Sequence, residues 1–171
     1  IKAGILTDGD RIELLEGYLV LKPAETPEHD FTILALSKRL VRMVPVGWEV
    51  RGQSAATFDD SEPEPDFAIV RGDESLYRHR HPVKEDMSLV IEVAVTSVER
   101  DTSDKARIYA AAGVPVYWVV NLPDRRVEVF TDPDPSAGRF RNRVEFQAGD
   151  SVPVVLDGTA VGSIAVAAIL P

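Results

Sequence analysis

Apolar positions recur with two different periods along the chain, and each period predicts its own kind of element. An apolar residue at every third or fourth position predicts an amphipathic helix over 26–44, where Thr26 suits the N-cap and Pro27 the first helical position, and another over 99–113. Shorter apolar runs predict strands. These are a hairpin at 11–23 that turns at Gly17, and strands at 48–53, 65–70, 89–95, 116–121, 126–132 and 139–146.

The order of these elements predicts the fold class. A hairpin, a helix, several strands, a second helix and further strands favour a mixed sheet with helices packed on it, an α/β or α+β fold. The segment between 89–95 and 116–121 has the length of a right-handed helical crossover, so these two strands should be parallel. Residues 71–86 predict a polar loop, and 161–170 predict a short closing helix. At this length, residues 1–171 are expected to form a single domain.

One predicted strand carries a carboxylate in its middle. Leu89, Val90 and Ile91 run directly into Glu92, and apolar residues follow it, which is typical of a strand buried on both faces. A charge in that position is costly unless a cation compensates it. Glu92 therefore marks a candidate functional site.

A second carboxylate is expected close to the first. Asp66 follows Pro65 at the entrance of an apolar strand. If that strand pairs with 89–95, Asp66 and Glu92 face each other across the strand spacing of about 4.8 Å. Oxygen ligands favour Mg²⁺ or Mn²⁺, so the pair could hold one divalent cation.

The helix after this strand adds a cation. Lys105 shares one helical face with Asp101 and Tyr109, at spacings of four residues. If that face meets the carboxylate end of the sheet, an ammonium lies beside the metal. Two carboxylates, a metal and a lysine can together hydrolyse phosphodiesters, because the metal activates water and stabilises charge on the phosphoryl oxygens, while the lysine orients or polarises the nucleophile.

Each of these residues also has a purely structural explanation. An Asp after Pro is usually a turn residue. Glu92 and Lys105 could form a structural salt bridge, and Lys105 could instead pair with Asp101 on an exposed helix surface. Only the combination of the three favours a catalytic site.

Composition limits the other function classes. The formal net charge of −9 argues against tight, non-specific binding of nucleic acid, so a nucleic-acid function must use local basic patches. The chain has no cysteine, which excludes disulfides and cysteine zinc sites and fits a reducing cytoplasm. No apolar stretch approaches the roughly 20 residues of a membrane span. No signal peptide is visible, although the sequence starts without Met.

Several stretches together resemble the Uma-type putative restriction endonuclease family, a branch of the PD-(D/E)xK nuclease superfamily. They are "LLEGYLV", "TPEHDF", "EPDFAIV", "LVIEVAVTSVERDTSDKARIYAAAGVPVYWVVN" and "RRVEVF". The resemblance covers nearly the whole chain and is most specific between Glu92 and Asn121. It implies a restriction-endonuclease-like fold and a nuclease that depends on Mg²⁺, with Mn²⁺ as a substitute, and acts on DNA.

The resemblance also implies residue roles. Asp66 and Glu92 would bind the metal, with the carbonyl of Val93 as a further ligand. In the superfamily a Lys stands two residues beyond the strand acid, where this chain has Ala94, and Lys105 in the next helix matches the Lys of this branch. Supporting positions would be Glu16 as an additional metal-side acid, His29 near the phosphate, Asp101 and Tyr109 orienting Lys105, and Gln53 as a weaker candidate.

Substrate contacts are expected from basic side chains on the helix 26–44 and in the loop after residue 71. They are Lys38, Arg39, Arg42, Arg78, Arg80 and Lys84. Nucleases that cut both strands are often dimers, so a homodimer is expected. The alternative is a nuclease fold that serves as a binding or assembly module without turnover, which the acidic charge and the displaced lysine favour.

Overall fold

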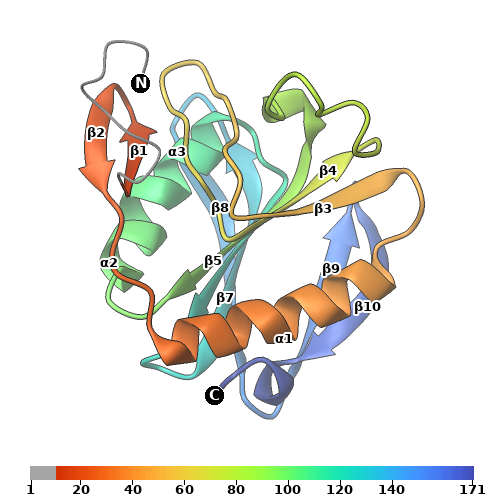
Figure 1. Cartoon of the computed structure of the whole chain (residues 1–171). Helices are drawn as coiled ribbons and strands as arrows, with labels where there is room; N and C mark the ends of the chain where they lie inside the picture. Colours follow the sequence, from red (N-terminus) through yellow and green to blue (C-terminus); the bar gives the residue numbers. More distant parts are fainter. Residues whose placement is uncertain (1–10) are drawn as a thin grey trace.

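The computed structural model describes residues 11–171, and its centre is a six-stranded mixed sheet (Figure 1). The strand order is β3-β4-β5-β6-β7-β8. Only β5 and β6 run parallel, with Glu92 opposite Val119, as the length of the crossover between them predicts. The strands are β3 (Trp48–Gly52), β4 (Phe67–Arg71), β5 (Met87–Ala94), β6 (Val116–Asn121), β7 (Arg126–Asp134) and β8 (Arg139–Gln147). The mixed α/β fold expected from the sequence is confirmed.

One face of the sheet is covered by α1 (Pro27–Met43) and by a separate hairpin of β9 (Ser151–Leu156) and β10 (Thr159–Ala165). The helix starts where the sequence predicts, because the Thr26 side chain accepts a hydrogen bond from the His29 backbone N–H. Leu36 and Leu40 are completely buried against the sheet. Burying a leucine side chain contributes about 1.5–3 kcal/mol, so this face anchors the helix.

The other face carries the second helical stretch and the N-terminal hairpin. The helix expected at 99–113 is divided into α2 (Val98–Arg100), a π-helical turn η2 (Asp101–Lys105) and α3 (Ala106–Ala111). The hairpin is β1 (Ile12–Leu15) with β2 (Tyr18–Leu21), which form a separate two-stranded sheet. Leu15 joins the apolar cluster that α3 forms with this face of the sheet. The hairpin therefore lies over the same face as η2 and α3.

The C-terminal region differs from its prediction. Residues 161–170 were expected to form a helix, but β10 continues to Ala165 and only Val166–Ala168 forms a 3-10 turn, η3. The hairpin β9–β10 turns at Asp157 and Gly158, whose φ angles of 47° and 78° suit a two-residue turn with two left-handed positions. An Asp-Gly pair between apolar runs is a strong hairpin signal, and it outweighs the weak helical spacing of the tail.

The polar loop expected at 71–86 is present, with a short 3-10 turn, η1 (Lys84–Asp86), at its end. No helix within residues 11–171 is long and apolar enough to cross a membrane.

Candidate functional site

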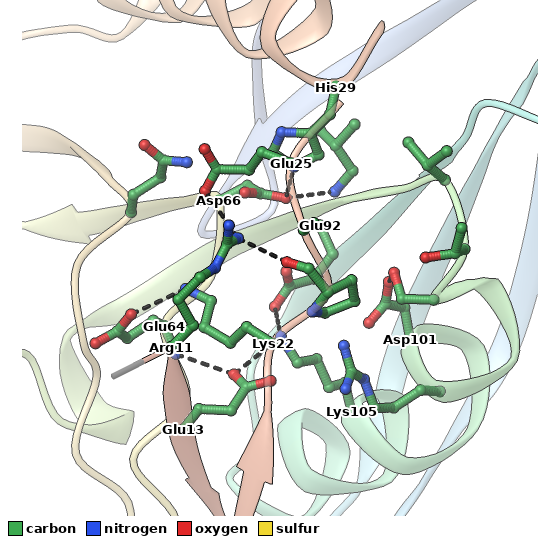
Figure 2. Close-up of a pocket in the computed structure, with 18 residues that line it drawn as sticks. Arg11, Glu13, Lys22, Glu25, His29, Glu64, Asp66, Glu92, Asp101 and Lys105 are labelled. Carbon is green, nitrogen blue, oxygen red and sulfur yellow. Dashed lines mark hydrogen bonds and ion pairs between the residues drawn. The ribbon is translucent and has the colours of Figure 1, made fainter. Parts of the chain in front are cut away.

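Three acidic residues singled out in the sequence, Asp66, Glu92 and Asp101, line a small cavity at the C-terminal end of β5 (Figure 2). Its volume is about 60 Å³, which is room for a few water-sized groups. The wall comes from the β1–β2 hairpin and the segment after it, the start of α1, the start of β4, the end of β5, and α2 with η2. Its charged or titratable residues are Arg11, Glu13, Lys22, Glu25, His29, Glu64, Asp66, Glu92, Arg100, Asp101 and Lys105.

The pairing of β4 with β5 places Asp66 and Glu92 side by side at one end of these two strands. The antiparallel register joins Phe67 to Ile91, so the next pair outward is Asp66 with Glu92. Both side chains point to the face of the sheet that η2 and α3 cover. Ala68 and Val90 lie two residues away from Asp66 and Glu92, and both belong to the apolar cluster on that face. The juxtaposition expected from the sequence is therefore present in the structure.

Asp66 is held by contacts to one of its two carboxylate oxygens. Its Oδ2 accepts a hydrogen bond from the backbone N–H of Val93 at 2.8 Å and lies 3.2 Å from Nε2 of His29. This hydrogen bond raises the pKa of His29, partly offset by burial of the ring. Oδ1 takes part in no hydrogen bond with residues 11–171, so it stays available to a ligand in the cavity.

Glu92 is almost completely buried and uses one oxygen for its contacts. Its Oε1 accepts hydrogen bonds from Lys105 Nζ at 2.9 Å and from the Tyr109 hydroxyl at 2.8 Å. Burial raises the pKa of Glu92 to about 8, although the Lys105 ammonium acts in the opposite direction. Nearby Asp101 and Asp66 add to the rise. Glu92 thus lies among other carboxylates, which together with burial disfavour its ionised form.

Lys105 is held by two carboxylates that come from different elements. Besides Glu92, its Nζ lies 3.1 Å from Oε2 of Glu13, which β1 brings into the cavity. Burial lowers the pKa of Lys105, but Glu92, Glu13 and Asp101 together raise it well above its ordinary value. Lys105 is therefore a permanent cation in this site and cannot act as a general base near neutral pH.

Glu13 is a site residue that the sequence analysis missed. Its side chain is completely buried, and its Oε1 has no hydrogen-bond partner among residues 11–171. The acid expected from the hairpin was Glu16, but that residue has a positive φ at the turn and forms an ion pair with Arg107, away from the cavity. Its place at the turn carries the Glu16 side chain away from the cavity, and its role as an additional acid beside the metal stays a prediction.

The π-helical turn brings Asp101 into the same group. Asp101 and Lys105 are the buried residues of η2, and Tyr109 follows on the same face of α3. Asp101 accepts a hydrogen bond from the Ser97 hydroxyl, and burial raises its pKa. The shared face of Asp101, Lys105 and Tyr109 agrees with their spacing. π-Helical turns occur frequently at functional sites, where they place one extra residue in a helix.

His29 and Gln53 also lie where the sequence analysis expects site residues. His29 lies at the start of α1 and contacts Asp66, as described above. Gln53 lines the cavity, has a φ of 45°, and donates its backbone N–H to the Asp66 carbonyl at 3.1 Å. Val93 contacts Asp66 through its N–H, and its carbonyl as a metal ligand stays a prediction.

The basic residues expected to bind nucleic acid do not reach this cavity. Lys38, Arg42 and Arg78 are exposed elsewhere. The others are engaged locally: Arg39 bonds the Ala35 carbonyl, Arg80 pairs with Asp86, and Lys84 pairs with Asp59. The cations that line the cavity besides Lys105 are Arg11, Lys22 and Arg100, none of which the sequence analysis selected. A role of these three cations in substrate binding is a prediction. The role of the six residues expected from the sequence also stays a prediction.

The residues present fit a divalent cation. Residues 11–171 contain no cluster of three or more His, Asp or Glu arranged to hold a metal by themselves. However, Mg²⁺ is usually held by one or two carboxylates together with waters and substrate phosphates. Asp66 Oδ1 and Glu92 Oε2 take part in no hydrogen bond with residues 11–171, and the neighbouring carboxylates Asp101, Asp66 and Glu13 all raise the pKa of Glu92. A divalent cation would offset this mutual repulsion of the carboxylates.

Comparison with known proteins agrees with this fold. The chain is similar in structure to a putative nuclease belonging to DUF820 from Anabaena variabilis ATCC 29413, with a TM-score of 0.72 and 14% sequence identity, over 92% of this chain and 88% of that one. Among curated proteins, none matches the sequence. The family model of Uma2, described as "Putative restriction endonuclease", matches residues 4–165. Because this match covers nearly the whole chain, including Asp66, Glu92 and Lys105, the protein belongs to the Uma2 family.

Proposed function

We propose that the protein is a divalent-cation-dependent endonuclease that hydrolyses DNA phosphodiester bonds. One observation carries the proposal: Asp66 and Glu92 meet at the ends of two neighbouring strands, beside the buried ammonium of Lys105, and each has an oxygen that takes part in no hydrogen bond with residues 11–171. Membership of the Uma2 family and the likeness to a nuclease fold support it.

Asp66 and Glu92 are the residues that would hold the cation, which we expect to be Mg²⁺, with Mn²⁺ as a substitute. When bound, such an ion lowers the pKa of water and neutralises charge on phosphoryl oxygens. The protein contributes the placement of the two carboxylates. Asp66 is fixed by the Val93 N–H and His29, and Glu92 is fixed by Lys105 and Tyr109.

Lys105 would stabilise the negative charge that develops on the phosphate. Its high pKa keeps it protonated, and it is held in place by Glu13 and Glu92, so no reorganisation is needed as charge develops. Removal of a single well-placed donor of this kind typically costs about 10²–10³ in rate. Tyr109 and Glu13 act through Lys105 and Glu92 and are positioning residues.

The test is calorimetric titration of Mn²⁺ together with a DNA cleavage assay, on the wild type, Asp66→Ala and Glu92→Ala. Circular dichroism establishes that each variant is folded. We expect the wild type to bind Mn²⁺ and cleave DNA, and both variants to lose cleavage. Glu74→Ala is the matched control, because it removes an exposed carboxylate outside the cavity and should change neither measurement. Equal cleavage by the wild type and both variants would exclude this assignment.

A module without turnover is the second candidate. The observation that favours it is the closed contact of Lys105 with two carboxylates, which occupies the ammonium in the protein alone. In that case the wild type would neither bind Mn²⁺ nor cleave DNA, even in the presence of a short duplex. Binding of Mn²⁺ only in the presence of the duplex would instead indicate a site that the substrate phosphate completes, and it would support the nuclease.

A further inference from the structure

Helix α1 has a second apolar face, directed away from the sheet. Its inner face is already buried through Thr32, Ala35, Leu36 and Leu40. On the outer face, Phe31, Leu34 and Val41 are 49%, 60% and 65% exposed. Figure 1 shows α1 along the outside of the molecule, with its outward side uncovered. Single exposed apolar residues are normal, but three on one helix face form a stripe that calls for an explanation.

The stripe has the spacing of a helix–helix seam. Phe31, Leu34, Lys38 and Val41 follow one another at intervals of three, four and three residues, which is the repeat of the core positions in a pair of packed helices. Lys38 is the one polar residue in the series. A polar residue at such a position commonly fixes the register and the number of helices, at some cost in stability.

The charges on either side of the stripe are divided between the two ends of the helix. Glu28 and Asp30 lie in the first turn, and Arg42 lies in the last. A helix with an acidic start and a basic end is complementary to a second copy of itself in the opposite direction. The helix dipoles are then antiparallel as well, which is also favourable.

We propose that the outer face of α1 is the interface between two copies of this chain, packed antiparallel about a two-fold axis. In the register that places Phe31 of one copy against Val41 of the other, Leu34 lies against Lys38. The same register brings Glu28 of each copy beside Arg42 of the other. Phe31 thus meets Val41 at both ends of the seam and the flanking charges pair, as a self-complementary two-fold interface requires.

The interface is small. Stable complexes typically bury about 800 Å² on each partner, more than one helix face supplies, so the dimer should be weak and depend on concentration. The inference is independent of the proposed nuclease function, because it uses no residue that lines the carboxylate cavity.

The first test is sedimentation equilibrium on substitutions at the centre of the stripe. Leu34→Lys places a lysine against Lys38 of the other copy and should abolish association. Lys38→Leu removes the polar residue from the seam and should strengthen association at least about tenfold, or ~1.4 kcal/mol. All these positions are exposed, so the fold should be retained, as circular dichroism can verify. Val144→Lys on β8, at another exposed apolar position, is the control and should change nothing.

A charge exchange tests the antiparallel register. Glu28→Lys alone and Arg42→Glu alone should each weaken association, because like charges then meet in both symmetric contacts. An equimolar mixture of the two variants should restore it, because every contact between unlike copies is again a pair of opposite charges. Recovery in the mixture supports this register, and no recovery contradicts it.

A different response to the same substitutions would show that the outer face of α1 binds nucleic acid and not a second copy of the chain. If α1 binds nucleic acid through its basic residues, Lys38→Leu should weaken DNA binding and Leu34→Lys should strengthen it, without any change in oligomeric state. That pattern, or a wild type and a Lys38→Leu variant that are both monomeric at high concentration, would overturn the proposal.

Discussion

At the scale of single residues, two ion pairs connect the N-terminal hairpin to the second helical stretch, and they differ in burial. Lys105 pairs with Glu13 inside the cavity, where both side chains are nearly inaccessible. Arg107 pairs with Glu16 at the surface, where both side chains are substantially exposed. Exposed pairs contribute little because water and salt screen them, whereas a buried charge that loses its partner is strongly destabilising.

Lys105→Met should therefore lower the free energy of unfolding by about 3–5 kcal/mol, because it leaves Glu13 and Glu92 buried without a cation. Arg107→Met is the matched control and should cost less than about 1 kcal/mol. Urea denaturation in the presence of a chelator measures both. Adding Glu92→Gln to Lys105→Met should recover part of the loss. Equal, small effects of the two single substitutions would mean that the buried pair does not contribute to stability.

Of the two acids that contact Lys105, the sequence predicts Glu92 as a site residue but not Glu13. Glu92 was selected because it interrupts an apolar strand, and Glu13 interrupts the apolar run "IELL" in the same way. The signal for Glu13 was therefore present. It was weaker because a two-stranded hairpin usually has one solvated face, so a polar residue within it needs no special explanation. What covers the hairpin depends on tertiary packing, which periodicity does not describe.

At the scale of elements, the turn of the β9–β10 hairpin depends on its glycine. Gly158 has a φ of 78°, where a Cβ atom is strained even though, apart from the chain neighbours, no atom of residues 11–171 would lie within 4 Å of it. Gly158→Ala should cost about 1 kcal/mol of folding stability. Gly149→Ala is the control, because that glycine also has open space but no positive φ, and the change should be neutral or slightly stabilising. Thermal unfolding of both variants measures the difference. A loss of equal size at both positions would show that the left-handed backbone is not the cause.

Elements with strong local signals were predictable from the sequence, and those set by competition between signals were not. Helix α1 has a cap, a proline at its start and a clear apolar period, and the crossover from β5 to β6 is determined by its length. Residues 161–170 have weak helical spacing, but the pairing of β10 with β9 after the Asp157–Gly158 turn overrides it. The π-helical turn η2 was also not predictable, because one extra residue in a helix changes no period over so short a segment.

At the scale of the whole molecule, the net charge of −9 opposes binding of a polyanion such as DNA. The carboxylates Glu13, Asp66 and Asp101 around Glu92 add local repulsion at the candidate site. A divalent cation at Asp66 and Glu92 would relieve this repulsion and offer positive charge to a phosphate. Binding of DNA should therefore depend on a divalent cation even under conditions where no cleavage occurs.

Fluorescence anisotropy with a short duplex in Ca²⁺, compared with EDTA, tests this dependence. We expect the wild type to bind about tenfold more tightly with Ca²⁺, a difference of ~1.4 kcal/mol. Asp66→Asn should have opposite effects in the two buffers. In EDTA it removes one repelling charge and should strengthen binding by roughly 1 kcal/mol or less, whereas in Ca²⁺ it removes a ligand and should lose most of the gain. Glu74→Gln removes one charge outside the cavity and should change neither value appreciably, because salt screens exposed charges beyond about 10 Å. If Asp66→Asn and Glu74→Gln behave alike, overall charge and not a cation at this site controls the affinity for DNA.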